Sequence, residues 1–215
     1  AALSRGRTAG DAYQRLGYGR WANLPATLAE VRRIEELVPG SVVYTGSSVD
    51  EGFVKELDER GELGGYRVIH LAMHGLVVPE IPELSALVLS QVQGRDDGED
   101  GYLRMEEIAA LRLEADFVSL SACETGLGKI YGGEGVVGLT QSFLLAGANG
   151  LCVSLWQVAD SSTMDFMTGL YRLVEEEGMS YARAVTEMKR RFITSGSSGR
   201  SSPFFWAPFV YYGKE

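Results

Sequence analysis

Cysteine and histidine are scarce in this sequence, which has two of each among 215 residues. Two cysteines, Cys123 and Cys152, are too few for a disulfide framework, so we expect a reducing, cytoplasmic setting in which a free thiol persists. The sequence also lacks a long uninterrupted apolar run and an apolar signal core at its start, which argues against a membrane span and a signal peptide. It does not begin with methionine, and we expect it to be a domain of a longer protein.

Basic residues are outnumbered as well. Lysine and arginine total 20 against 29 aspartates and glutamates, which gives a formal net charge of -9. Non-specific binding to nucleic acid or to an anionic membrane surface requires clustered positive charge, so we expect neither as a partner. A basic protein or peptide substrate fits this charge better, and nothing in the sequence calls for a cofactor.

The length and a hydrophobic content of 45% describe one globular domain with a full core. Residues 1–23 are rich in glycine and arginine without periodicity, and we interpret them as a linker or partial amino-terminal arm before a domain at 24–215. Strand and helix patterns alternate along that domain, which predicts right-handed parallel crossovers and an α/β fold. The predicted strands are 42–44, 66–73, 85–90, 116–123, 150–158 and 208–212, and the predicted helices are 25–38, 49–60, 105–111, 136–146, 162–177 and 181–193.

Two of the apolar strands end in residues suited to nucleophilic catalysis. His74 follows the strand at 66–73, and Cys123 ends the strand at 116–123, 49 residues later. A thiol attacks carbonyls as the thiolate, so it needs a nearby imidazole to take its proton. Both residues lie at the carboxyl ends of their strands, where α/β sheets form ligand crevices, and they meet if the two strands are parallel neighbours. A histidine about 50 residues before the cysteine is also the order found in caspases.

Five motifs carry a resemblance to a known family. They are His74-Gly75, 121–126 (Ser-Ala-Cys-Glu-Thr-Gly), 133–139 with 146–148, 154–160 (Ser-Leu-Trp-Gln-Val-Ala-Asp) and 206–209 (Trp-Ala-Pro-Phe). In this order they resemble the CHAT domain family, whose members are caspase-like cysteine peptidases related to separases and gingipains. The resemblance implies a three-layer sandwich with a mostly parallel central sheet and helices on both faces. It also implies a catalytic pair of His74 as base and Cys123 as nucleophile, and tetratricopeptide repeats upstream in a longer bacterial protein.

The expected reaction is peptide cleavage through a thioester on Cys123. The backbone N–H groups of Gly75 and Cys123 are the expected oxyanion donors. Glu134 and Asp160 are candidates for binding a basic residue before the scissile bond. Trp156 is a candidate for an apolar wall of the pocket instead. Asp160 is equally well explained as a helix N-cap, and Trp156 as a core residue.

Several alternatives stay open beside the peptidase. The domain is otherwise a catalytically silent interaction scaffold, or an anion- or nucleotide-binding regulatory module that uses the glycine-rich loop at 126–135, although this loop lacks the P-loop pattern. His70 is interpreted as a core or sheet residue rather than as a zinc ligand, and Cys152 as a packing residue. The acidic segment 96–107 partly matches a calcium loop, but a solvated acidic loop is favoured.

Overall fold

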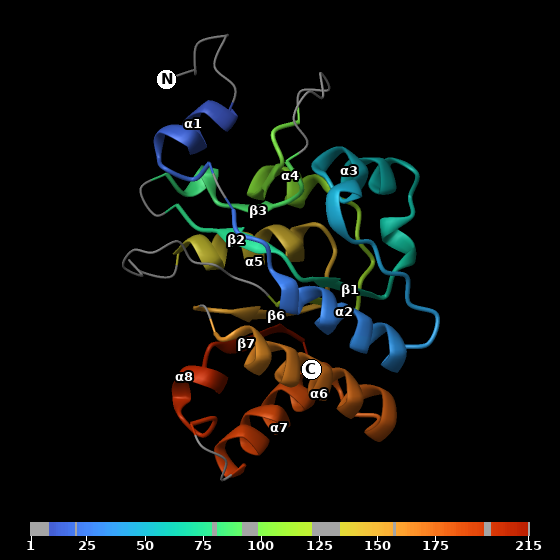
Figure 1. The fold of residues 1–215 in the computed structure, drawn as a ribbon. Coiled ribbons are helices and arrows are strands. Elements are labelled where there is room, and N and C mark those ends of the chain that lie inside the picture. Colours follow the sequence, from blue (N-terminus) through green and yellow to red (C-terminus); the bar gives the residue numbers. More distant parts are fainter. Residues whose placement is uncertain are drawn as a thin grey trace.

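A four-stranded sheet forms the centre of the molecule in the computed structural model (Figure 1). The structure describes residues 9–19, 21–78, 81–91, 99–121, 134–156, 158–195 and 199–214. The strand order is β1 (Val68–Leu71), β5 (Phe117–Leu120), β6 (Gly150–Ser154) and β7 (Phe209–Gly213). Strands β1, β5 and β6 are parallel, and β7 is antiparallel to β6. The prediction of a mixed α/β fold with a mostly parallel sheet is therefore confirmed.

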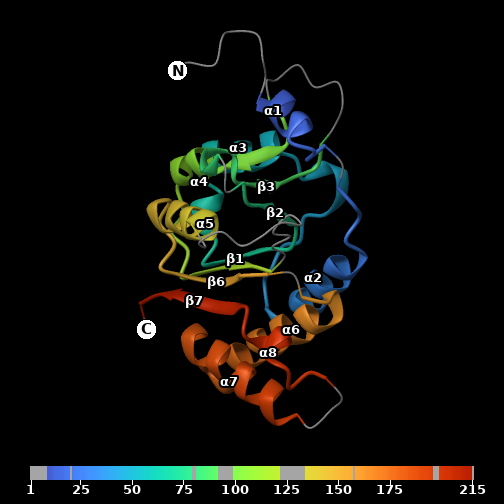
Figure 2. The ribbon, with the colours of Figure 1, turned by 90° about the vertical axis from the view of Figure 1, so that its left-hand side faces the viewer.

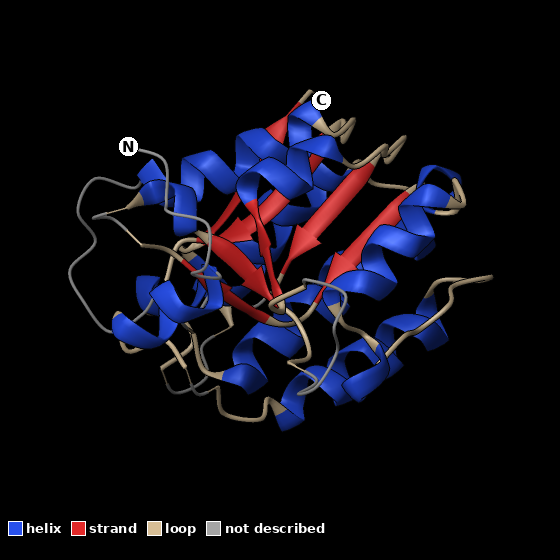
Figure 3. Ribbon diagram, turned by 90° about the horizontal axis from the view of Figure 1, so that it is seen from above, coloured by secondary structure: helices blue, strands red, loops and turns tan. Residues whose placement is uncertain are grey.

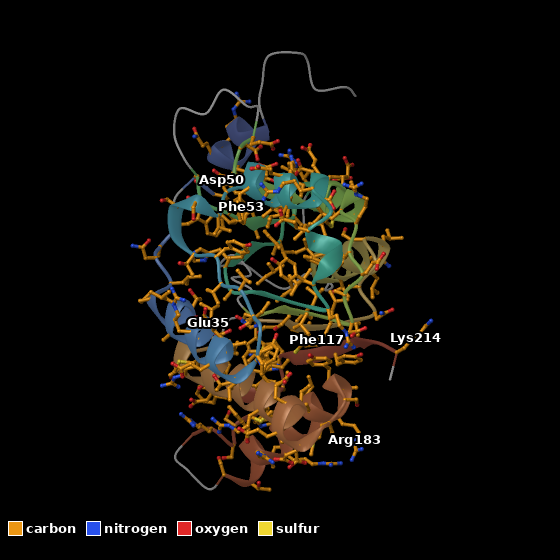
Figure 4. All side chains as sticks on the ribbon, turned by 90° about the vertical axis from the view of Figure 1, so that its right-hand side faces the viewer. Glu35, Asp50, Phe53, Phe117, Arg183 and Lys214 are labelled. Atoms are coloured by element: carbon orange, nitrogen blue, oxygen red, sulfur yellow. The ribbon has the colours of Figure 1, made fainter. Side chains whose placement is uncertain are left out.

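Helices pack against both faces of this sheet, as Figures 1 and 2 show. On one face lie α2 (Pro25–Leu37), α6 (Asp160–Glu177), α7 (Tyr181–Thr194) and α8 (Pro203–Trp206), and on the other lie α3 (Glu51–Glu59), α4 (Met105–Ala110) and α5 (Glu134–Leu145). Successive residues of β5 enter the two cores alternately, because side chains of a strand point to opposite faces. Phe117 belongs to the core under α6 and α7, whereas Val118 belongs to the core under α5. Figure 4 accordingly labels Phe117 well apart from Phe53 of α3.

A second, antiparallel sheet lies beyond the end of β1. It contains β2 (His74–Leu76), β3 (Ala86–Val88) and β4 (Tyr102–Arg104), in that order. Figure 3 shows the strands in the middle of the molecule with helices around them. The amino-terminal helix α1 (Ala9–Arg15) packs on this small sheet through Tyr13, which is fully buried. Short 3-10 turns complete the described elements at Gly46–Ser48, Leu63–Gly65 and Pro82–Leu84.

The predicted strand at 42–44 is wrong. These residues have no regular secondary structure, and no described backbone hydrogen bond joins them to β1. The side chain of Val42 is 56% exposed, and the ring of Tyr44 packs on Phe53 of α3 instead. β-branched residues favour a strand only where a neighbouring strand supplies hydrogen bonds and packing, and this segment has neither.

Most other boundaries are shifted by a few residues. The strand expected at 66–73 ends at Leu71, and the next strand starts separately at His74. The helix expected at 25–38 is α2, whose N-cap is Leu24. Within the described parts of the chain, no helix combines the length and the apolar character that crossing a membrane requires.

Candidate active site

The pairing of β1 with β5 fixes where the two candidate catalytic residues leave the sheet. Leu71 is the register partner of Leu120, and all four register pairs of these strands are 49 residues apart. His74 and Cys123 have the same separation, so each comes three residues after its member of the Leu71–Leu120 pair. The backbone N–H of Ser121 extends the pairing by donating to the carbonyl of Leu71 over 3.0 Å. The prediction that the two strands are parallel neighbours is confirmed.

His74 is the first residue of β2, and its side chain is buried at the junction of the two sheets. Its Nε2 lies 2.6 Å from the carbonyl oxygen of Ala22. Because a carbonyl only accepts, Nε2 carries the hydrogen, and in the neutral ring Nδ1 is then the atom that can take up a proton. The indole of Trp21 packs on the same imidazole, with ring centroids 5.1 Å apart.

The contact of the Ala22 carbonyl with His74 has no counterpart among the predicted site residues. Ala22 lies 52 residues from His74 in sequence and belongs to the segment interpreted as a linker or arm. Any residue type supplies a backbone carbonyl, so no sequence signal marks it.

Three of the candidate site residues fall wholly or partly outside the described part of the structure. Cys123 lies in the segment 122–133, two residues after the last described position of that stretch. Glu134 and Asp160 are the first residues of α5 and α6, but their side chains are outside the description. The N-cap of α6 is Ala159, so the alternative interpretation of Asp160 as the N-cap is wrong.

Gly75 and Trp156 lie on different elements. Gly75 is buried in β2 opposite Leu87. Trp156 follows β6, packs at the edge of the core under α6 and donates its indole N–H to the carbonyl of Phe204 over 3.0 Å. This bond ties the end of β6 to α8 and holds the indole in one orientation. The oxyanion and pocket roles of these two residues stay predictions.

His70 lies in β1, which confirms its interpretation as a core or sheet residue. Only 9% of its side chain is exposed. Its Nε2–H donates to the buried carboxylate of Glu30 on α2 over 2.8 Å, and its Nδ1 lies 3.1 Å from the hydroxyl of Tyr171 on α6. Burial raises the pKa of that hydroxyl well above its ordinary value. The imidazole therefore links two helices to β1.

A cluster of three carboxylates surrounds Lys55 of α3. The Nζ atom of Lys55 lies 2.8 Å from Glu51, 2.6 Å from Glu99 and 2.8 Å from Glu107. Carboxylate oxygens of these three residues lie within 4.8 Å of one another, a spacing that would suit a hard cation. The ammonium group already bridges them, so the donor set fits Lys55 rather than a metal. The acidic segment is thus partly engaged in ion pairs rather than solvated, and positions 92–98 lie outside the described residues.

Glu51 is the most buried member of this cluster. Its side chain is 1% exposed and accepts the backbone N–H groups of Asp100 and Gly101. Burial, assisted by hydrogen bonds with Glu99 and Glu107 and opposed by Lys55, raises the pKa of Glu51 to about 8. A hydrogen bond from Glu51 lowers the pKa of Glu99, and hydrogen bonds from Lys55 and Arg104 outweigh burial and lower that of Glu107.

We expect Glu51→Gln to remove a pH dependence of stability. Between the ordinary pKa of 4.5 and about 8, folded Glu51 holds a proton that the unfolded chain releases, so the free energy of unfolding falls as pH rises through this interval. Glu99 and Glu107 are ionised in both states there and contribute no slope. Urea titrations at pH 5.5, 7 and 8.5 should give a flatter profile for Glu51→Gln. Glu56→Gln, a change on the exposed face of α3, should keep the wild-type slope, and equal slopes for all three proteins would contradict the prediction.

The fold and the placement of His74 define a class of protein. A mostly parallel sheet covered by helices is an α/β domain, and the buried His74 follows the end of its edge strand β1 by three residues. The sequence model of the CHAT domain matches residues 6–214, and the chain belongs to this family. The match includes most of the segment interpreted as a linker or arm.

Two mammalian proteins that share one name are similar to part of this chain. The chain is 28% identical over 113 residues to tetratricopeptide repeat protein 28 of Mus musculus, and 27% identical over 133 residues to tetratricopeptide repeat protein 28 of Homo sapiens. These matches cover 53% and 56% of this chain but only 4% and 5% of the two relatives. The chain therefore corresponds to a small part of much longer proteins that are named for their repeats.

Proposed function

We propose that this domain is a cysteine endopeptidase in which Cys123 attacks a peptide carbonyl and His74 is the general base. The observation that carries the proposal is the register of β1 with β5, which brings the chain to the same edge of the sheet three residues before His74 and three residues before Cys123. The hydrogen bond from Ser121 to Leu71 supports it, because the two strands still run side by side two residues before the cysteine. The proposed architecture is the caspase-like sandwich of the family.

The proposed chemistry uses both nitrogens of His74. Nδ1 takes the proton of the Cys123 thiol, and the thiolate adds to the peptide carbonyl carbon. The backbone N–H groups of Gly75 and Cys123 are the proposed donors to the resulting oxyanion. The imidazolium returns its proton to the leaving amine as the C–N bond breaks, and water then hydrolyses the thioester. The Ala22 carbonyl accepts from Nε2–H throughout, which keeps the tautomer and stabilises the imidazolium charge.

The proposed substrates are proteins or peptides with a basic residue before the scissile bond. The net charge of -9 and the acidic candidates Glu134 and Asp160 support this preference, with Trp156 as an apolar wall. We further propose that the domain is the effector part of a longer repeat-containing protein, since the curated relatives are named for tetratricopeptide repeats.

A thiol-directed probe tests the proposal. Cys152 lies fully buried in β6, so an iodoacetamide probe applied to the folded protein should label Cys123 alone. Peptide mapping by mass spectrometry assigns the labelled cysteine. We expect rapid labelling in the wild type, at least tenfold slower labelling in His74→Ala because the thiolate loses its base, and no turnover of a peptide library by Cys123→Ala.

Two outcomes of this experiment would reject the proposal. Equal labelling of Cys123 with and without His74, together with no cleavage by the wild type, would favour the silent scaffold. Cleavage that persists in purified Cys123→Ala would remove the cysteine from the mechanism. Titration with nucleotides, monitored by thermal stability, tests the anion-binding module in the same preparations.

A further inference from the structure

Four aromatic residues join the amino-terminal arm to the small sheet that contains His74. Tyr13, Tyr18 and Trp21 come from the arm, and Tyr102 comes from β4. Tyr102 lies in register with Val88 of β3, which in turn lies in register with His74 of β2. The three positions thus form one row across the small sheet, with the arm packed over it.

The hydroxyl of Tyr102 connects two points of the arm. It accepts the indole N–H of Trp21 over 3.1 Å and donates to the carbonyl of Tyr18. The ring of Tyr102 is 3% exposed and stacks on Tyr13 with centroids 3.7 Å apart, so the hydroxyl has a fixed position. Tyr102 therefore holds both the Trp21 indole, one residue before Ala22, and the carbonyl of Tyr18, four residues before it.

Trp21 transmits this position to the imidazole. Its ring lies tilted at 41° to the His74 ring with centroids 5.1 Å apart. Its own residue directly precedes Ala22, whose carbonyl accepts from Nε2 of His74. A rotation of the indole would thus move both the packing surface and the hydrogen-bond acceptor of the imidazole.

We propose that Tyr102 and Trp21 are positioning residues that hold the His74 imidazole in its reactive orientation through the Tyr102 hydroxyl, the Trp21 indole and the Ala22 carbonyl. This inference rests on the proposed function, in which His74 is the general base and the orientation of its ring matters. Neither residue touches the substrate in this account. The amino-terminal arm is consequently part of the site rather than a linker, and displacing it would turn the imidazole away from the thiol.

The test compares Tyr102→Phe with Tyr13→Phe in the full 215-residue chain. Each variant removes one hydroxyl from the same stack, and the Tyr13 hydroxyl donates to the carbonyl of Leu84 rather than to the arm. We expect kcat for peptide cleavage to fall about 10- to 100-fold in Tyr102→Phe with KM within about twofold of the wild type, because an error of about 1 Å in a catalytic group has effects of this size. Tyr13→Phe should lose stability but keep kcat.

A second measurement does not depend on cleavage. The chain has two histidines, so ¹⁵N-histidine labelling gives the signals of two imidazole rings, and the signals that disappear in His74→Ala belong to His74. The Nε2–H of His74 should be visible and protected from exchange in the wild type and in Tyr13→Phe, and lost or rapidly exchanging in Tyr102→Phe. Trp21→Phe, which keeps an aromatic ring beside His74 but removes the indole N–H, should behave like Tyr102→Phe.

The outcomes separate this inference from the proposed function. A wild type without peptidase activity would reject the proposed function, and the imidazole signals would still decide whether Tyr102 and Trp21 hold the ring. If Tyr102→Phe and Trp21→Phe keep the protected Nε2–H signal and the kcat of Tyr13→Phe, the positioning role is overturned. Equal losses of kcat in Tyr102→Phe and Tyr13→Phe, in proportion to lost stability, would likewise overturn it.

Discussion

His74→Ala is expected to lower kcat for peptide cleavage by about four orders of magnitude or more, with KM almost unchanged. Removal of the general base from a nucleophile–histidine pair has effects of this size, because the thiol then has to lose its proton to water. The side chain is 7% exposed and lies at the junction of the two sheets, so its loss also leaves a small cavity. Steady-state kinetics on a cleaved peptide, with thermal unfolding of each variant, give the measurement.

His70→Gln is the matched control, because His70 is the other histidine of the chain and lies one strand earlier. A glutamine amide still donates to Glu30, so the fold should survive with a lower melting temperature. We expect kcat within about threefold of the wild type, since nothing places this imidazole at the reacting atoms. Equal loss of activity in both variants, tracking lost stability, would contradict a specific role for His74.

Gly147→Ala is expected to be among the most destabilising single substitutions in the chain. Gly147 follows α5 with a φ of +112°, and a Cβ built there would lie 1.9 Å from the carbonyl oxygen of Leu113. The same turn is fixed by a 2.7 Å hydrogen bond from the N–H of Leu113 to the carbonyl of Ala146, so the two backbones cannot separate freely. Strain and overlap together should cost about 4 kcal/mol or more, which lowers the melting temperature by roughly 10 °C in a chain of this size.

Gly178→Ala separates backbone strain from steric overlap. Gly178 is the C-cap of α6 at a φ of +63°, and a Cβ there would meet no atom within 4 Å. Only the penalty of the left-handed conformation applies, which is about 1–2 kcal/mol. Thermal and urea unfolding of both variants give the comparison. Similar losses of unfolding free energy in Gly147→Ala and Gly178→Ala would show that the contact between Gly147 and the Leu113 carbonyl is not tight.

The central sheet and the long helices could be predicted because their patterns extend over many residues. The helices α6 and α7 have 18 and 14 residues, enough for apolar positions to repeat over several turns. Of the second sheet only β3 was expected, within the strand predicted at 85–90. Strands β2 and β4 have three residues each and are too short to establish an alternation. The prediction of a strand at 42–44 is wrong for the opposite reason, since the composition of this segment favours a strand but the fold provides no partner strand.

Long-range polar contacts limited the prediction of the site. His74 was predicted from its position after an apolar run, a signal that is local in sequence. The Ala22 carbonyl contacts His74 across 52 residues of sequence, and the Tyr102 hydroxyl contacts Trp21 across 81. Any residue type supplies a backbone carbonyl, so the sequence does not mark the first of these contacts. The bonds from Lys55 to Glu99 and Glu107 likewise span 44 and 52 residues. Such contacts follow from the topology of the chain and not from any short motif.

The distance between the Cys123 sulfur and the His74 imidazole tests the account most directly. A crystal structure of the full chain, alkylated or free at Cys123, would supply it. The account predicts that Sγ lies within about 4 Å of Nδ1 in the free protein, while Nε2 keeps its bond to the Ala22 carbonyl. A sulfur enclosed in the core, or one more than about 8 Å from both ring nitrogens, would contradict the shared edge on which the mechanism depends.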